Sequence, residues 1–369
     1  MNATVAIFRK RLLSYSETFI ADQGRGLPNA RALFCGYHRD TSGIAMLDGS
    51  DCLLLDEYAR LGSLSKLMLR SGLGGGKRWI DAIAAQHPAL LHAHFFKDGI
   101  DALRIGQRLQ IPVITTVHGH DITKYENAPV GSGQNRAFFD RVDRVIAVSE
   151  FIAEQALAKG CPEQKLVQHY IGIDLDKFTL ARQESDEPSL LFVGRLVEKK
   201  GCTYLLQAME QLKPRFPELR LTIIGDGDLG PALQREAQER QLNVDFAGTA
   251  TPAQIRDRLS QSWLFVAPSI TANSGDAEGL GMVFLEAQAL ETPVVSFRSG
   301  GLVEAVEDGV TALLCEEKDV QGLANNIARL LENPGERHNM GMAGRQRVAQ
   351  HFDLRKQCAK LESIYDGLL

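Results

Sequence analysis

Two glutamates in residues 276–294 (DAEGLGMVFLEAQALETPV) are the side chains of this chain best suited to chemistry. Glu278 begins a glycine-rich turn, and Glu286 is expected about two turns into the apolar helix that follows. The residues whose backbone N–H groups lie in or beside that turn are Gly279, Leu280, Gly281 and Met282. Because the first N–H groups of a helix lack intrahelical partners, this turn suits a diphosphate. The carboxylates only accept hydrogen bonds, so they would serve sugar and ribose hydroxyls. The alternative is a capped core helix with two solvated glutamates.

A pair of cations points to the same ligand. Residues 190–206 (LLFVGRLVEKKGCTYLL) predict a buried strand that ends at Gly194, followed by Arg195 on a loop and Lys200 at a helix start. A guanidinium and an ammonium group five residues apart can neutralise a diphosphate, and the arginine can do so through two hydrogen bonds. The alternative is that Lys199 and Lys200 are solvated residues of the helix start, which we expect of one of them.

The strongest competing signal is a glycine motif in residues 220–237 (RLTIIGDGDLGPALQREA). Its glycines, spaced as G-x-G-x-x-G between a strand and a helix, are Gly225, Gly227 and Gly230. With Asp245 twenty residues beyond the first glycine, the spacing is typical of dinucleotide sites and favours an oxidoreductase. However, the motif normally opens its domain, whereas here the VGR loop precedes it, and no group suited to hydride transfer follows. We interpret the segment, including Asp226, as close strand–helix packing beside a nucleotide, with Pro231 at the first helical position.

Polar residues follow two predicted strands in the first half of the chain. The strand Val113–Val117 runs into His118-Gly119-His120-Asp121, written HGHD. Strand ends face the ligand crevice of an α/β sheet, so His118 and Asp121 could reach a ligand there; a structural histidine is the alternative. Near the N-terminus, residues 14–19 (SYSETF) follow the first strand, and Glu17 is a candidate ligand contact. The alternative is that Ser14 and Glu17 form a helix-capping box.

Composition limits the class of protein. A chain of 369 residues with 44% hydrophobic and 24% charged residues suits two globular domains. A net charge of −5 argues against binding to nucleic acid. Six scattered cysteines, without a C-x-x-C pair, are typical of reduced and mostly buried thiols in a cytoplasmic protein. No signal peptide or membrane span is predicted.

No metal site is predicted. Two D-x-D pairs, Asp174-x-Asp176 and Asp226-x-Asp228, resemble metal-binding motifs. Each is a short turn without supporting ligands, so we expect neither to bind a cation.

Short apolar runs alternate with helical patterns throughout, which predicts an α/β fold with parallel sheets. In the first half the expected strands are Thr4–Phe8, Arg31–Cys35, Cys52–Leu55, Leu90–His94, Val113–Val117, Val145–Val148 and Leu166–Tyr170. In the second half they are Leu190–Val193, Leu221–Ile224, Val244–Phe246, Leu264–Val266, Pro293–Ser296 and Ala312–Leu314. Helices are expected between them, for example Gly99–Gln110 and Glu150–Lys159.

The predicted elements fall into two doubly wound, Rossmann-like domains that face each other across a ligand cleft. The polar stretch Ala181–Pro188 (ARQESDEP) is typical of a linker, so the domains are residues 1–180 and 181–351. An amphipathic helix pattern ends the chain at Phe352–Leu369, and we expect it to pack back on the first domain.

Several motifs together carry a family resemblance: VGRLVEKKG (193–201), IGDGDL (224–229), PS (268–269), EGLGMVFLEAQALETPVV (278–295) and SGG (299–301). They resemble the nucleotide-sugar domain of retaining glycosyltransferases of family 4, which share the GT-B fold. HGHD (118–121) and YIGID (170–174) resemble the N-terminal signatures of that family. SETFI (16–20) is similar to members that build bacterial exopolysaccharide, colanic-acid-like or lipopolysaccharide chains.

The resemblance implies a role for each matching residue. Arg195 and Lys200 would hold the diphosphate of a UDP- or GDP-sugar, helped by the N–H groups of Gly281 and Met282. Glu278 would bind hydroxyls of the transferred hexose, Glu286 the ribose, and His118 the sugar near its 6-position. The N-terminal domain would bind a saccharide or lipid-linked saccharide acceptor.

The chain departs from the family pattern in two places. Many relatives carry a glycine pair after the first strand, where this chain has SYSETF. Glu291 replaces the glycine usual before T-P, which we expect to have no consequence on an exposed turn.

The implied chemistry is metal-independent transfer with retention of configuration. Fixed cations and helix-terminal amides can stabilise the leaving diphosphate in a dry site. No carboxylate is identifiable as a nucleophile, so the leaving phosphate would accept the proton of the acceptor. A sugar-nucleotide epimerase or hydrolase of the same fold, an NAD(P)-dependent oxidoreductase and a non-catalytic binding protein are the alternatives.

Residues 60–80 (RLGSLSKLMLRSGLGGGKRWI) carry five basic and no acidic side chains among apolar ones. Such a stretch can lie on an anionic bilayer, which suits a lipid-linked acceptor at the inner membrane. Our hypothesis is a cytoplasmic protein that associates peripherally through this segment. An ordinary surface helix followed by a glycine loop is the alternative.

Overall fold

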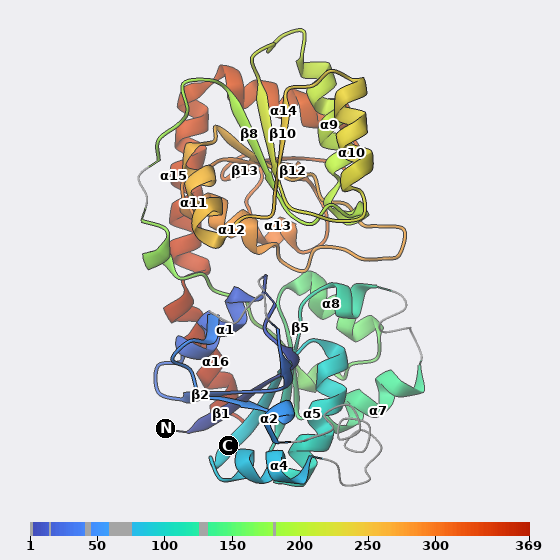
Figure 1. Cartoon of the computed structure of the whole chain (residues 1–369), viewed down its shortest axis with the longest axis vertical. Helices are drawn as coiled ribbons and strands as arrows, with labels where there is room; N and C mark the ends of the chain where they lie inside the picture. Colours follow the sequence, from blue (N-terminus) through green and yellow to red (C-terminus); the bar gives the residue numbers. More distant parts are fainter. Residues whose placement is uncertain (1–2, 15, 41–45, 59–75, 125–131, 180–181) are drawn as a thin grey trace. The chain divides into compact units, whose positions relative to one another are not determined.

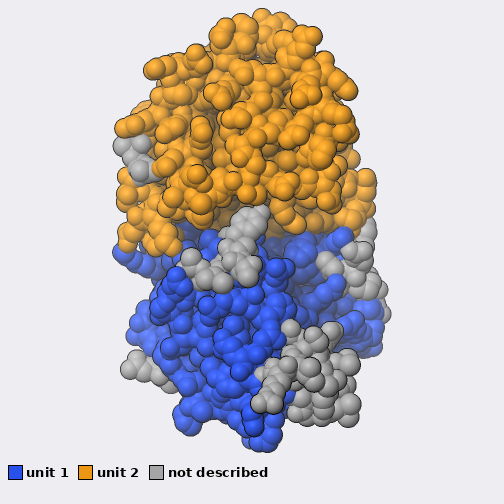
Figure 2. Space-filling view, in the orientation of Figure 1, with its two compact units in different colours: residues 1–173, 354–369 blue, residues 174–353 orange. Residues whose placement is uncertain are grey.

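A computed structural model describes residues 3–14, 16–40, 46–58, 76–124, 132–179 and 182–369. The chain forms two compact units, one of Met1–Ile173 with Leu354–Leu369 and one of Asp174–Asp353 (Figure 2). We call them unit 1 and unit 2.

Unit 1 is built on a parallel sheet with the strand order β3-β2-β1-β4-β5-β6-β7 within the described residues (Figure 1). Its strands are β1 (Thr4–Leu12), β2 (Arg31–Arg39), β3 (Cys52–Leu54), β4 (Pro88–His94), β5 (Val113–Val117), β6 (Arg144–Ala147) and β7 (Leu166–Gln168). Its helices are α1 (Thr18–Arg25), α2 (Leu55–Tyr58), α4 (Lys77–Ala84), α5 (Phe96–Leu109), α6 (His120–Thr123), α7 (Gly133–Arg141), α8 (Glu150–Ala158) and α16 (Leu354–Asp366), with the 3-10 turn η2 (Glu163–Lys165). The strand order reverses between β1 and β4, which is where such sheets bind ligands.

Unit 2 repeats the plan with the order β10-β9-β8-β11-β12-β13. Its strands are β8 (Ser189–Val193), β9 (Arg220–Ile224), β10 (Val244–Gly248), β11 (Leu264–Val266), β12 (Val294–Phe297) and β13 (Ala312–Cys315). Its helices are α9 (Cys202–Leu212), α10 (Gly230–Glu239), α11 (Pro252–Gln261), α12 (Met282–Ala289), α13 (Leu302–Ala305), α14 (Val320–Glu332) and α15 (Pro334–His351), with the 3-10 turns η3 (Leu175–Lys177) and η4 (Glu198–Lys200). Here the order reverses between β8 and β11.

Every strand expected from the apolar runs is present, with ends that differ by a few residues. The largest difference is β1, which continues through Arg9, Lys10 and Arg11 to Leu12 and pairs with β2 along its length. Charged residues interrupt the apolar pattern there. The strand accommodates these residues because carboxylates compensate their charges. Arg9, for example, forms ion pairs with Glu17 and Asp98.

The C-terminal helix α16 belongs to the core of unit 1. Leu361 and Tyr365 are 1% and 3% exposed and join the hydrophobic cluster around β1 and β4. Polar contacts add to this packing: the Glu362 carboxylate accepts hydrogen bonds from the backbone N–H groups of Asn29 (2.8 Å) and Ala30 (2.7 Å). Unit 1 is therefore assembled from both ends of the chain.

Glu291 does not lie on an unstrained exposed turn. Its φ is +59°, in the left-handed region that favours glycine, and its side chain is half-buried. A weak ion pair of 3.8 Å joins its carboxylate to Nε of Arg345. The expected exposed position is therefore wrong, and we expect a side chain at this φ to strain the backbone.

The basic segment of residues 60–80 lies mostly outside the described residues, which resume at residue 76. In the described part, Trp79 and Ile80 belong to α4 and are 0% and 7% exposed. Trp79 donates a hydrogen bond of 2.9 Å from Nε1 to the carbonyl oxygen of Leu53. These two apolar side chains pack in the core and do not face a membrane.

Candidate functional site

An ion pair joins two of the predicted site residues in unit 2. Nζ of Lys200 lies 2.7 Å from Oε1 of Glu278, and the side chains are 12% and 9% exposed. Lys200 ends the turn η4 after β8, and Glu278 lies on the loop between β11 and α12. The strand order reverses between these two strands, so the pair occupies the ligand-binding position of a doubly wound sheet.

The surroundings of Glu278 keep it ionised. Burial alone would raise its pKa, but the neighbouring ammonium groups of Lys200 and Lys199 and the Arg195 guanidinium lower the pKa to about 2. A carboxylate that stays charged can accept hydrogen bonds from several hydroxyl groups but can donate none.

Lys199 is also buried, which contradicts the expectation that one of the two lysines would be solvated. It is 7% exposed, and its Nζ lies 2.9 Å from Oδ1 of Asp276. The backbone joins the same two loops, because Ile270 N donates to the Lys199 carbonyl oxygen (2.8 Å). The sequence analysis misjudged Lys199 and missed Asp276. They bind the loop after β8 to the loop after β11 and so hold Lys200 beside Glu278.

Arg195 is the exposed cation of this cluster. It is the second residue after β8, and it forms no ion pair within the described part of the chain. Asp276 compensates Lys199 and Glu278 compensates Lys200, which leaves the Arg195 charge available. The cluster thus has an excess of one positive charge, as an anion site requires.

The glycine-rich turn before α12 can offer a ligand its backbone groups, but its glycines have no side chain to offer. Gly281 is the N-cap, with φ +83°, and Met282 is the first helical residue. The Leu280 side chain is 2% exposed and packs in the core, so only its main chain can serve a ligand. Glu286 is half-buried and is the fifth residue of α12, a little over one turn from the helix start and not two.

Two buried serine hydroxyls lie in the loops around Glu278. The Oγ atoms of Ser269 and Ser299 have no hydrogen-bond partner among the described residues. Ser299 opens the SGG segment, whose Gly301 N–H donates to the Glu278 carbonyl oxygen at 2.9 Å. The sequence signal for both was their place in the PS and SGG motifs.

The G-x-G-x-x-G segment packs against a neighbouring loop. A Cβ on Gly225 would lie 1.9 Å from the carbonyl oxygen of Gly194, and one on Gly227 would lie 2.5 Å from that of Leu196. Asp226 is exposed, and its Oδ1 accepts a hydrogen bond from its neighbour Gly227 (2.7 Å). These glycines let two loops meet, where we expected strand–helix packing. Pro231 does lie in the first turn of α10.

In unit 1, Glu17 belongs to an ion-pair network centred on Arg9. Nη2 of Arg9 lies 2.5 Å from Oε1 of Glu17, and Nη1 pairs with Asp98. Glu17 also accepts from Ser14 N (3.1 Å), and the Ser14 hydroxyl lies 3.3 Å from that of Ser16. Glu17 itself is the N-cap of α1, so Ser14 and Glu17 do not form the alternative capping box of that helix. Arg9 was missed, because the predicted strand Thr4–Phe8 ended before it, whereas β1 includes it.

Asp121 shapes the loop that carries His118. Its buried carboxylate accepts hydrogen bonds from the N–H groups of Phe96 (2.9 Å), His118 (3.0 Å) and Gly119 (2.9 Å). All three hydrogen bonds lie within unit 1. Asp121 thus fixes the backbone at His118 and Gly119.

His118 contacts a second histidine that sequence reasoning missed. Its Nε2 lies 3.0 Å from Nδ1 of His94, the last residue of β4. His92, two residues earlier on the same face of the strand, stacks on His94 with ring centroids 4.5 Å apart. The H-x-H spacing at the end of an apolar strand was the available signal.

Known protein families match both halves of this chain. A family model described as Glycosyl transferases group 1 matches residues 176–347, and one described as Glycosyltransferase Family 4 matches residues 55–177. WcaL of Salmonella typhimurium, named for colanic acid biosynthesis, is 30% identical over 74% of this chain and 69% of its own length. The chain belongs to glycosyltransferase family 4.

Other relatives of this glycosyltransferase differ in the substrates for which they are named. AmsK of Erwinia amylovora, named for amylovoran biosynthesis, is 28% identical over 86% of this chain and 81% of AmsK. The GDP-mannose-dependent alpha-(1-6)-phosphatidylinositol monomannoside mannosyltransferase of Mycolicibacterium smegmatis is 30% identical, covering 69% of this chain and 70% of the enzyme. Family membership excludes the oxidoreductase that the glycine motif alone would favour.

Solved structures confirm the GT-B fold of this glycosyltransferase. Anabaena Alr3699/HepE in complex with UDP and glucose has a TM-score of 0.79 at 19% identity, with 99% of each chain covered. The prediction of two doubly wound parallel sheets is therefore confirmed.

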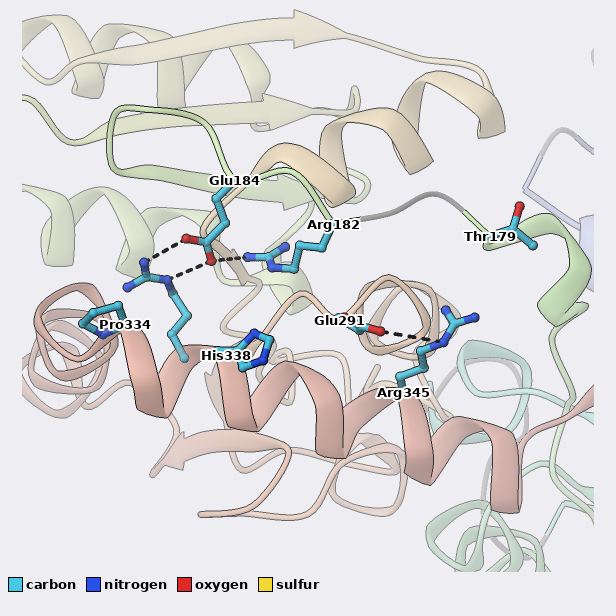
Figure 3. Close-up of a pocket in the computed structure, with 8 residues that line it drawn as sticks. Thr179, Arg182, Glu184, Glu291, Pro334, His338 and Arg345 are labelled. Carbon is cyan, nitrogen blue, oxygen red and sulfur yellow. Dashed lines mark hydrogen bonds and ion pairs between the residues drawn. The ribbon is translucent and has the colours of Figure 1, made fainter.

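A pocket of about 510 Å³ lies elsewhere in unit 2, beside α15. Figure 3 shows the Glu184 carboxylate facing the Arg182 guanidinium in this pocket, which Arg337 of α15 also lines. Glu184 accepts from Arg337 at 3.0 and 2.8 Å and from Arg182 at 3.0 Å. The carboxylate and the two guanidinium groups compensate one another. Their hydrogen bonds attach the segment that follows residue 181 to α15.

Two further findings concern metal binding and membrane-spanning helices. The described residues contain no group of three or more His, Cys, Asp or Glu placed to hold a metal ion. They also contain no helix that is both long and apolar enough to span a bilayer.

Proposed function

We propose that the enzyme transfers a hexose from a UDP- or GDP-sugar to a saccharide or lipid-linked saccharide acceptor, with retention and without a metal. The cluster of Arg195, Lys200 and Glu278 carries this proposal. It combines an available cation with an ionised carboxylate, and a donor sugar has a diphosphate and hydroxyls to match.

Each part of the donor would contact a different part of unit 2. Arg195, Lys200 and the N–H groups of Gly281 and Met282 would bind the diphosphate, because cations and helix-terminal amides both favour anions. Glu278 would accept hydrogen bonds from the transferred sugar, and Glu286 from the ribose.

The transfer step follows from this arrangement. The bond between the anomeric carbon and the diphosphate oxygen breaks, and the acceptor oxygen bonds to the same face of the sugar. The acceptor proton passes to the leaving phosphate, whose growing charge Arg195 and Lys200 stabilise. His118 in unit 1 would contact the sugar near its 6-position, and unit 1 would bind the acceptor.

Donor identity is tested by thermal shift with UDP, GDP and ADP, and then with their sugars. A ligand that binds only the folded enzyme raises the melting temperature according to its affinity. We expect a shift with one of UDP and GDP, none with ADP, and loss of the shift in Lys200→Met. A shift unchanged by Lys200→Met would contradict the site.

Retention and metal independence are tested on the reaction itself. NMR of the product is expected to show the anomeric configuration of the donor, with the rate unaffected by EDTA. Inverted product or loss of activity with EDTA would refute the respective part of the proposal. Release of the nucleotide at the same rate with and without any saccharide acceptor would instead indicate a hydrolase or epimerase.

Peripheral membrane association stays a separate proposal, because its basic residues lie mainly in 60–75, outside the described residues. Liposome flotation is expected to show binding to anionic vesicles only. Equal binding to neutral vesicles, or none to either kind, would count against it.

A further inference from the structure

Two histidines from neighbouring strands share one hydrogen bond in unit 1. Nδ1 of His94 and Nε2 of His118 lie 3.0 Å apart, with the rings inclined by 25°. His94 is 1% exposed at the end of β4, and His118 is half-buried just after β5. One of these two nitrogens donates to the other.

The two remaining ring nitrogens decide which one donates. His94 Nε2 and His118 Nδ1 are buried and have no hydrogen-bond partner among the described residues. Burial holds the pKa of both histidines well below 6.5, so each ring is neutral and carries one proton near pH 7. The protonated nitrogen outside the shared bond therefore lacks an acceptor in the protein.

The cost of that unpaired N–H depends on where it lies. If His118 donated, the unpaired N–H would be Nε2 of His94, which is enclosed in the core and out of reach of a ligand. If His94 donates, the unpaired N–H is Nδ1 of His118, which lies just after β5 and is the more exposed of the two residues. Each arrangement leaves one N–H without a protein acceptor, and that N–H costs less on the more exposed residue, where a small movement lets a water or ligand oxygen accept it. The second arrangement is therefore favoured.

We propose that His94 is a positioning residue that donates from Nδ1 to His118 and holds His118 as the Nδ1–H tautomer. His118 then donates from Nδ1 to a hydroxyl oxygen of the transferred sugar. The sugar contact rests on the proposed function, whereas the tautomer is a property of the free enzyme.

The surroundings hold the pair in one orientation. His92 stacks on His94 and is itself fixed by hydrogen bonds of 2.7 Å to the Tyr365 hydroxyl and the Thr116 hydroxyl. On the other side, the Phe95 ring lies 4.5 Å from the His118 ring. Fixing the ring by packing lowers the entropy lost when a ligand binds.

The tautomer is tested by long-range ¹H–¹⁵N NMR of enzyme labelled at histidine, with His118 assigned by its loss in His118→Asn. We expect the proton on Nδ1 in the wild type and in His94→Asn, whose amide N–H can replace the donor. We expect a mixture of tautomers in His94→Leu. A proton on Nε2 of His118 in the wild type would overturn the proposal.

Kinetics test the consequence for the sugar. We expect kcat/KM for the donor to fall about tenfold in His94→Leu, as loss of one hydrogen bond predicts, and to recover mostly in His94→Asn. His338→Leu, the same substitution in unit 2, is the control and should change nothing. With a 6-deoxy donor, His94→Leu should cost less than twofold; an undiminished tenfold loss would show a merely structural role. A wild type that transfers no sugar would refute the proposed function while the NMR result still decides the tautomer.

Discussion

Lys200 and Glu278 form a buried ion pair of 2.7 Å between loops that follow different strands of unit 2. In the proposed function Lys200 would bind an anion and Glu278 would bind hydroxyl groups, so the pair would join two binding functions in one contact. Each side chain also keeps the other from being an unpaired buried charge. Activity and stability are therefore coupled at this position, and mutations can separate them.

Lys200→Met should lower transfer at least a hundredfold, because a fixed charge beside the leaving group is lost. It should also cost about 3 kcal/mol of unfolding free energy, since Glu278 remains buried and charged. The double variant Lys200→Met, Glu278→Gln should regain most of that stability and none of the activity.

Urea unfolding of unit 2 provides the measurement. The chain has two tryptophans, Trp79 in unit 1 and Trp263 in unit 2, so a Trp79→Phe background leaves a probe of unit 2 alone. Equal stabilities of the single and double variants would show that the pair does not matter for folding.

The same pair gives the stability of unit 2 a defined pH dependence. The folded-state pKa of Glu278, about 2, lies below its ordinary value of 4.5. Its contribution is therefore complete above pH 4.5 and is lost as the pH falls towards 2. Between pH 6 and 3.5 the wild type should lose about 1 kcal/mol more than Glu278→Gln does. Parallel losses in the two proteins would contradict this.

Gly225 and Gly248 offer a matched comparison, because both have positive φ but differ in the space around them. A Cβ at Gly248 (φ +67°) meets nothing within 4 Å, whereas one at Gly225 (φ +143°) would lie 1.9 Å from the Gly194 carbonyl oxygen. Gly248→Ala should cost about 1 kcal/mol and Gly225→Ala about 3 kcal/mol or more. Only Gly225→Ala should reduce the thermal shift with nucleotide, because it displaces the loop that carries Arg195.

Glu291→Gly should stabilise unit 2 by about 1 kcal/mol, because glycine adopts the φ of +59° without strain. Glu291→Ala is the matched control: it removes the same partly exposed ion pair with Arg345 but keeps a Cβ, so no gain is expected. A similar gain in both variants would locate the effect in the carboxylate and not in the backbone.

Periodicity predicted the sheets well, because buried parallel strands are short apolar runs whatever their neighbours are. The same search for apolar runs ended the predicted strand at Phe8, before the true end of β1, because residues 9–11 are charged. Carboxylates outside the strand, those of Glu17 and the distant Asp98, explain why the strand continues.

The candidate site was predictable only where its residues lie close in sequence or match a motif. Lys200 and Glu278 were selected separately, but nothing in the sequence indicated that they touch. His94 was passed over because its partner His118 lies just after the next strand, and their contact depends on the register of β4 and β5. Lys199 was misjudged because its compensating Asp276 lies 77 residues away.

Unit 1 includes the last helix of the chain, so during synthesis its sequence is completed after that of unit 2. Unit 2 is one continuous segment and can fold as soon as residue 353 has left the ribosome. The N-terminal residues, although made first, must wait for Leu361 and Tyr365 to fill their core and for Tyr365 to bond His92. A nascent chain stalled before α16 emerges would therefore hold a finished C-terminal lobe and an unfinished N-terminal one.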